Sequence, residues 1–192
     1  MNRKYWLFAI VTVLMTVLDQ VTKIWVVRNI RYRIDEIEII PGVLSLVHAQ
    51  NPGAALGMLN TYEYRMHVFA VFTIIALVVL GQMLMQLPRD DRFQTTALAF
   101  ITSGAIGNAI DRIDKQSVTD FIRFYTEHPE LKPWLIETIG TNEYPSFNVA
   151  DAAICTGLGL FVIHFLFLQE DTEGLEPDPP SAPLDTGSST DA

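Results

Sequence analysis

The stretch Gly104–Asp120, GAIGNAIDRIDKQSVTD, decides the organisation of this chain, because it ends an apolar segment with small and then polar residues. On a helix, Gly104, Asn108 and Asp111 fall on one face, since residues three and four apart are neighbours. Glycines allow a second helix to approach closely, and the polar side chains must face protein or water rather than lipid. We therefore expect a polar site at the end of a membrane segment.

Four long apolar blocks dominate the sequence, at residues 5–27, 67–87, 93–110 and 147–168. Each is long enough to cross a hydrocarbon core of about 30 Å as a helix. The first block lacks an Ala-x-Ala cleavage site, so we expect a retained helix rather than a signal peptide. The sequence predicts a mainly α integral membrane protein, with four transmembrane helices in a folded part that covers residues 1–168.

The long loops, residues 28–66 and 113–146, differ in pattern. In the first, Ile37-Glu38-Ile39 alternates, Pro41-Gly42 indicates a turn, and residues 43–47 are rich in strand formers. This pattern predicts two short strands that lie against the membrane or the helices, because a free hairpin is marginally stable. The second is expected to be a long loop, with three prolines and mixed charges.

The formal charge of −9 is mostly local. Seven acidic residues and no Lys or Arg lie beyond residue 168, so the remainder carries only −2. This acidic, Pro-rich segment, residues 169–192, has almost nothing to bury and is expected to be a disordered tail. No basic patch with interleaved aromatics is present, so nucleic acid is not an expected partner.

The sequence gives little support for a metalloprotease site or for a catalytic serine or cysteine nucleophile. The four histidines are scattered without a His-Glu-x-x-His pattern, and no Gly-x-Ser-x-Gly is present. Cys155 is the single cysteine, which excludes an internal disulfide and a Cys-based zinc cluster. It lies in an apolar run and is expected to be a buried, inert thiol. We expect neither a metal nor a cofactor.

Carboxylates gather at one end of the third and fourth spans. Asp111 and Asp120 follow the third span, while Asn148 and Asp151 open the fourth at i, i+3 spacing. Close like charges separate two proton affinities, which leaves one acid protonated and one ionised. The ionised acid can activate water for attack on a peptide carbonyl that the protonated acid polarises. The pattern favours aspartic-protease chemistry.

A second charged pair lies inside the first span, where Asp19 precedes Lys23 at i, i+4. One interpretation is a structural ion pair near the membrane surface, with Lys23 extending outward to water. The other is that both residues organise the polar site.

Two other functional classes compete with a peptidase. A small transporter or proton-conducting protein also carries intramembrane Asp and Asn, but predicts carboxylates near the midplane and inverted repeats, and no repeat is visible. A non-catalytic assembly protein would use Gly104 and Gly107 only for helix packing.

Five short motifs occur in order across these spans. They are Asp19–Lys23 (DQVTK), Asn51–Ala55 (NPGAA), Gly107–Arg112 (GNAIDR), Val118–Phe121 (VTDF) and Phe147–Asp151 (FNVAD). Together they resemble the lipoprotein signal peptidase (signal peptidase II) family of bacterial inner membranes, over about residues 19–168.

The resemblance implies an aspartic endopeptidase that removes signal peptides from diacylglyceryl-modified prolipoproteins by cutting before the lipidated cysteine. It implies Asp120 and Asp151 as the catalytic pair, and Asp111 is the alternative to Asp120 on sequence grounds. The substrate-binding or supporting residues would be Asp19, Lys23, Asn51, Gly53, Asn108, Asp111, Arg112 and Asn148.

The resemblance also implies a multi-pass protein of the bacterial cytoplasmic (inner) membrane, with both termini in the cytoplasm. The site would lie at the outer surface beside a small extracytoplasmic β-sheet, in contact with membrane lipids, and a monomer is presumed. Counting Lys and Arg alone would place the long loops in the cytoplasm, which conflicts with this orientation. Residues 127–144 form an insertion relative to the family pattern and are a candidate lid or partner site.

Overall fold

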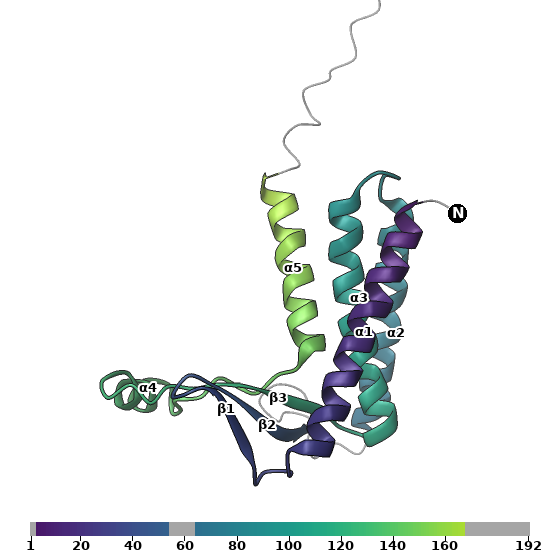
Figure 1. Ribbon diagram of the computed structural model, residues 1–192. Helices are drawn as coiled ribbons and strands as arrows, with labels where there is room; N and C mark the ends of the chain where they lie inside the picture. The colour runs from purple at the N-terminus through teal and green to yellow at the C-terminus, as the bar shows by residue number, and fades with distance from the viewer. Residues whose placement is uncertain (1–2, 54–63, 168–192) are drawn as a thin grey trace, which may run out of the picture.

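The computed structural model describes residues 3–53 and 64–167. Four long helices run side by side and a small sheet lies across one end of them (Figure 1). The long helices are α1 (Arg3–Asn29), α2 (Arg65–Gln86), α3 (Arg92–Lys115) and α5 (Val149–Phe167), and a short helix α4 spans Leu131–Ile139. The predicted tail, residues 169–192, lies outside the described residues.

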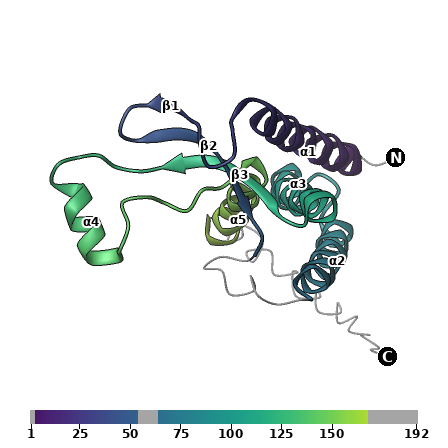
Figure 2. The same cartoon turned by 90° about the horizontal axis from the view of Figure 1, so that it is seen from below.

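Three of the four predicted spans are confirmed by length and composition: α1, α2 and α5 are long and apolar enough to cross a membrane. Residues 93–110 are helical within α3, but α3 does not meet this criterion. The reason is its position, since α3 packs against α1, α2 and α5 (Figure 2). Its polar residues, including Thr95, Ser103 and Asn108, are buried between neighbouring helices, where they avoid lipid.

Glycines set the spacing of α3 and α5, as the sequence indicated. A Cβ atom at Gly104 would lie 2.3 Å from the carbonyl oxygen of Ala150, and one at Gly157 would lie 2.6 Å from that of Ala97. Only residues without a side chain permit this approach. The two helices therefore meet backbone to backbone near both ends of their contact.

The sheet has three antiparallel strands in the order β1-β2-β3, with β1 at Glu36–Ile40, β2 at Leu44–Asn51 and β3 at Val118–Phe124. The predicted hairpin of the first loop is confirmed. Gly42 occupies its turn with φ +73°, a conformation that Gly adopts without steric cost. Val26 of α1 and Ile30, the residue that follows the helix, pack against Phe121 of β3, which attaches the sheet to the helices.

The expected long loop, residues 113–146, contains regular structure that the sequence did not predict. Helix α3 continues to Lys115 and ends at Gln116, whose φ of 56° is left-handed. Strand β3 then pairs with β2, and α4 follows. The pairing joins segments about seventy residues apart, which a local pattern does not reveal.

The expectation of a buried thiol at Cys155 was also wrong. Cys155 is exposed on α5, because the apolar run around it presents most of its surface outward rather than to a protein core. Exposed apolar residues are numerous on α1, α2 and α5 in the same way, as expected for helices whose solvent is lipid.

Candidate active site

Asn148 connects the two candidate catalytic carboxylates. Its side-chain Nδ2 donates a hydrogen bond of 2.8 Å to Asp120 Oδ1, and its backbone N–H donates to Asp151 Oδ2 at 3.3 Å. Asn148 Oδ1 accepts from the backbone N–H of Asp151 at 3.0 Å. The structure thus brings Asp120, from β3, and Asp151, from the first turn of α5, to opposite sides of one asparagine.

The local sequence explains this placement. Asn148 is the N-cap residue of α5, and its reciprocal bonds with Asp151 form a capping box. The residue before it, Phe147, accepts backbone hydrogen bonds from Phe121 and Ile122 of β3 through one carbonyl oxygen. The start of α5 is therefore fastened to the strand that carries Asp120.

Asn108 orients the second carboxylate from α3. Its Nδ2 donates to Asp151 Oδ1 at 2.7 Å. Its Oδ1 accepts from Lys23 Nζ at 3.1 Å and from Asn148 Nδ2 at 3.3 Å. Because both of these neighbours are donors, they fix which end of the Asn108 amide faces Asp151.

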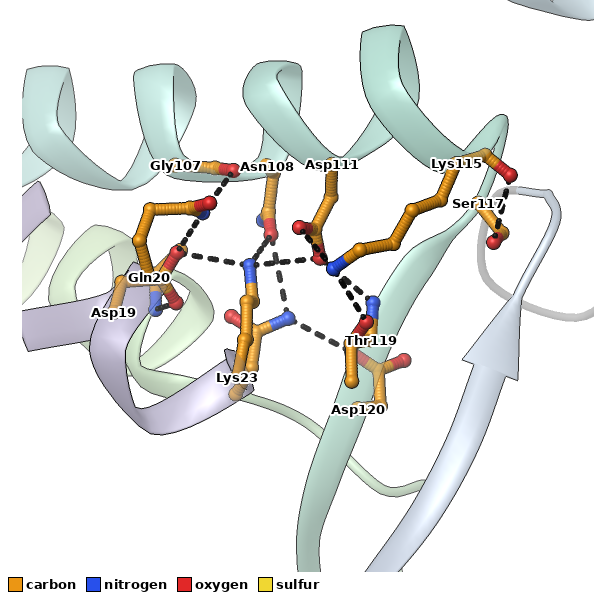
Figure 3. Close-up of polar contacts among 12 residues, drawn as sticks. Asp19, Gln20, Lys23, Gly107, Asn108, Asp111, Lys115, Ser117, Thr119 and Asp120 are labelled. Carbon is orange, nitrogen blue, oxygen red and sulfur yellow. Dashed lines mark hydrogen bonds and ion pairs between the residues drawn. The ribbon is translucent and has the colours of Figure 1, made fainter. Parts of the chain in front are cut away.

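Lys23 lies at the centre of a buried charge network (Figure 3). Its Nζ is 2.9 Å from Asp19 Oδ2 and 3.4 Å from Asp111 Oδ2, and the Lys23 side chain is completely buried. The interpretation in which Lys23 extends outward to water was wrong. Three polar partners converge inside the protein, and together they compensate the cost of burying the ammonium group.

Asp19 and Asp111 are both saturated by donors. Asp19 Oδ1 accepts from the backbone N–H of Ala150 at 2.9 Å, which connects α1 to the first turn of α5. Asp111 accepts from Lys115 Nζ at 3.0 Å and from the backbone N–H of Thr119 at 2.9 Å. Asp111 is 1% exposed and Asp120 4% exposed, so their partners, rather than their burial, distinguish the two carboxylates.

Asp120 differs from Asp111 in its partners. Its carboxylate oxygens accept hydrogen bonds from two neutral amides, those of Asn148 and Asn51. Asn51 is the last residue of β2, and its Nδ2 lies 3.2 Å from Asp120 Oδ2. Burial, and next the negative charge of Asp151, raise the pKa of the Asp120 carboxyl from 3.8 to about 6, although the two amide hydrogen bonds lower it. Gly53 donates its N–H to Asn51 Oδ1 at 3.2 Å, which orients the Asn51 amide toward Asp120.

Arg112 makes no hydrogen bond to this network within the described residues, but its charge lies within electrostatic range of Asp151, Asp120 and Asp111. Its guanidinium stacks over the ring of Phe69 at 4.5 Å. It also lines an apolar cleft of about 470 Å³ between α2 and α3. Arg112 therefore lies between this cleft and the carboxylates.

Sequence reasoning missed several members of the network. Lys115 Nζ donates a hydrogen bond to the Thr119 hydroxyl oxygen at 3.3 Å, and Gln20 Nε2 donates one to Asp19 Oδ2 at 3.0 Å. Lys115 could have been found, because it follows Asp111 at i, i+4. In residues 3–53 and 64–167, no group of three or more His, Cys, Asp or Glu side chains could hold a metal ion.

Comparison with known proteins identifies the family. The model of the Signal peptidase (SPase) II family matches residues 11–167. A lipoprotein signal peptidase of Maridesulfovibrio salexigens is 43% identical over 164 residues, covering 84% of this chain and 96% of the relative. One from Geobacter metallireducens is 34% identical over 166 residues, covering 86% and 94%.

Solved structures agree with this assignment. A bacterial membrane enzyme determined by the in meso method at 2.3 Å resolution superposes with a TM-score of 0.69 at 28% identity, covering 90% of this chain and 93% of its own. A second, at 1.9 Å, gives a TM-score of 0.68 at 30% identity, covering 83% and 92%. Matched along nearly its whole folded part, the chain belongs to the signal peptidase II family.

Proposed function

We propose that this protein is an aspartic endopeptidase acting within the membrane, with Asp120 and Asp151 as its catalytic pair. It removes signal peptides from diacylglyceryl-modified prolipoproteins by cutting before the lipidated cysteine. The observation that carries the proposal is the pair of carboxylates held by one asparagine, Asn148, with hydrogen bonds of 2.8 and 3.3 Å. The substrate class rests on the relatives, which are named lipoprotein signal peptidases.

The different surroundings of the two carboxylates suggest their roles. Asp120 has a pKa raised to about 6 and is the member that holds a proton. Asp151, with two N–H donors from Asn108 and Asn148, is the ionised member. Asp151 takes a proton from water, whose oxygen attacks the peptide carbonyl carbon while Asp120 donates its proton to the carbonyl oxygen. When the C–N bond breaks, Asp151 protonates the leaving amine and Asp120 regains its proton.

The supporting residues hold this pair in place. Asn108 and Asn148 orient the carboxylates, while Asn51, itself held by the Gly53 N–H, donates a further hydrogen bond to Asp120. Asp19 and Asp111 pair with the buried Lys23, and Lys23 in turn donates a hydrogen bond to Asn108 Oδ1 and holds its side chain in place. Arg112, at the cleft between α2 and α3, is placed to contact polar groups of a bound lipid or peptide.

The topology that fits this chemistry has four spans, with α3 as the fourth. Packing of α3 against α1, α2 and α5 supports its inclusion, since the other three present apolar surfaces around it. Both termini then lie in the cytoplasm, and the sheet and the carboxylates lie at the outer surface of the bacterial inner membrane. Water reaches the pair there while the signal helix and acyl chains stay in lipid. The protein acts as a monomer, and its acidic tail is dispensable for cleavage.

The test is cleavage of a diacylglyceryl-modified prolipoprotein peptide by the purified full chain. Asp120→Asn and Asp151→Asn should each abolish cleavage before the lipidated cysteine, while both variants unfold cooperatively. Asp114→Asn is the matched control, because Asp114 is an exposed carboxylate on the same helix as Asp111. Retained cleavage by Asp120→Asn would exclude it and direct attention to Asp111. Failure of folded wild type to cleave any lipidated substrate would overturn the proposal.

A further inference from the structure

Helix α4 stands out because nothing in the described protein buries it. It spans Leu131–Ile139, and none of its nine residues is buried. Its large apolar side chains are open instead: Leu131 45%, Trp134 57%, Ile136 46% and Ile139 63% exposed. Exposed apolar patches of this kind mark a contact surface.

The apolar residues of α4 form a stripe. Leu131, Leu135 and Ile139 follow one another at i, i+4 and i+8, so they lie along one line of the helix. Trp134 and Ile136 flank this line on either side. Pro133 and Glu137 lie on the opposite face. The helix is therefore amphipathic. Its apolar side, which also holds Lys132 and Thr138, is not buried by any of the described residues.

The position of α4 indicates what covers this stripe. Figure 1 places α4 at the far end of the sheet, level with the ends of α1 and α3 that the sheet adjoins. Seen from below in Figure 2, α4 lies outside the outline of the long helices. Three of those helices are apolar enough to cross a membrane. A bilayer spanned by them would have the headgroups and upper acyl chains of one leaflet at this level. Helix α4 projects into that layer.

The charges of α4 are those of a neutral interfacial helix. It carries one cation and one anion, and Lys132 is already paired with Glu127 at 2.6 Å. No excess positive charge is left to select anionic lipids. A tryptophan beside aliphatic residues suits the bilayer interface, where its ring is apolar and its N–H is wet.

We propose that α4 is an interfacial membrane anchor, lying in the headgroup layer on the side of the membrane that holds the carboxylates, with its apolar stripe inserted toward the acyl chains. The anchor is built into the connection between the strand of Asp120 and the helix of Asp151. It ties the outer part of the sheet to the bilayer surface. It accounts for the exposed apolar side chains of α4. The proposal does not depend on the peptidase activity.

Depth-dependent quenching of tryptophan fluorescence tests this anchor. The chain has three tryptophans, and Trp6 and Trp25 are exposed residues of α1. A Trp6→Phe/Trp25→Phe protein leaves Trp134 as the sole reporter. Two matched proteins move the reporter by combining Trp134→Phe with either Ile139→Trp or Glu137→Trp. Each is reconstituted in phosphatidylcholine vesicles with a nitroxide-labelled lipid, or with iodide on both sides of the membrane.

The expected result is loss of most emission to the nitroxide lipid at positions 134 and 139, with little loss at 137. Iodide should give the reverse order. Equal, weak quenching by lipid at all three positions, with strong quenching by iodide, would place α4 in water and overturn the proposal. Shielding of positions 134 and 139 from both quenchers would also overturn it, because another protein surface, such as a second copy, would then cover the stripe. Thermal unfolding of each variant verifies the fold.

Discussion

The close approach of α3 to α5 can be tested by adding one methyl group. A Cβ atom at Gly104 would lie 2.3 Å from the Ala150 carbonyl oxygen, whereas ordinary contact begins at 3.4 Å. The helices must therefore separate by about 1 Å there, because packed backbone has no room to yield elsewhere. Ala150 immediately precedes Asp151, so the displacement acts on a proposed catalytic carboxylate. We expect Gly104→Ala to lower kcat about 100-fold, the scale of a 1 Å misplacement.

Two glycines of α5 provide matched controls. A Cβ atom at Gly157 would lie 2.6 Å from the Ala97 carbonyl oxygen, but it is about 9 Å along the helix from Asp151. Gly157→Ala should cost a similar free energy of unfolding, about 1–3 kcal/mol, with a much smaller loss of kcat. A Cβ atom at Gly159 would meet nothing within 4 Å. Gly159→Ala should leave kcat unchanged and stabilise α5 by up to about 1 kcal/mol.

The assay is steady-state cleavage of a lipidated peptide at saturating concentration, which gives kcat, with thermal unfolding measured on the same preparations. Wild-type kcat in a folded Gly104→Ala protein would refute the reasoning, since the spacing of α3 and α5 would then not control the carboxylates. Equal losses of kcat in Gly104→Ala and Gly157→Ala would refute it too, because the effect would be global.

Other perturbations test the charges. Because the folded-state pKa of Asp120 is raised from 3.8 to about 6, wild-type stability should fall by up to about 3 kcal/mol as pH rises between these values. Asp120→Asn should therefore have a higher melting temperature than wild type at about pH 8 but not at about pH 4. The same difference in melting temperature at both pH values would contradict this. Wild-type kcat/KM should fall as pH rises through about 6, since Asp120 must hold a proton; a flat profile would argue against that role. Lys23→Met leaves Asp19 buried without a cation and should cost about 3–5 kcal/mol in unfolding free energy, more than Lys115→Met, whose side chain is 28% exposed. Lys4 donates to the Leu84 and Leu87 carbonyl oxygens at 2.8 and 2.7 Å, so Lys4→Met should lower the melting temperature and leave kcat unchanged; a lower kcat would show that the two ends of the helices are coupled.

Local patterns were sufficient for the elements with a local cause. The apolar runs of α1, α2 and α5 predict their lengths to within a few residues, because burial in lipid requires a fixed number of apolar residues. Pro41 and Gly42 predict the β1–β2 turn because one residue there needs a positive φ. The glycine spacing of α3 likewise predicted a close helix contact.

The rest depended on partners far apart in sequence. Lys23 turns inward because Asp19, Asn108 and Asp111 converge on it from two helices, and no local rule chooses between that and an outward rotamer. Strand β3 forms because β2 offers it an edge. The sequence did not predict α4, because the surface that would bury its apolar residues is not part of the described protein.

The backbone hydrogen bonds between Phe147 and β3 have a consequence for the evolution of the sequence. Phe147 and Ile122 exchange backbone hydrogen bonds, at 2.8 and 3.1 Å, which closes the chain between Asp120 and Asp151 into a loop with a fixed neck. Whatever lies beyond the neck can lengthen, shorten or be exchanged without moving either carboxylate. Doubling the length of a loop adds only about 0.6 kcal/mol to the free energy of closing it, so insertions there change the stability of the protein little. The segment that carries α4 is thus a place where new surface properties can be acquired while the chemistry stays constant.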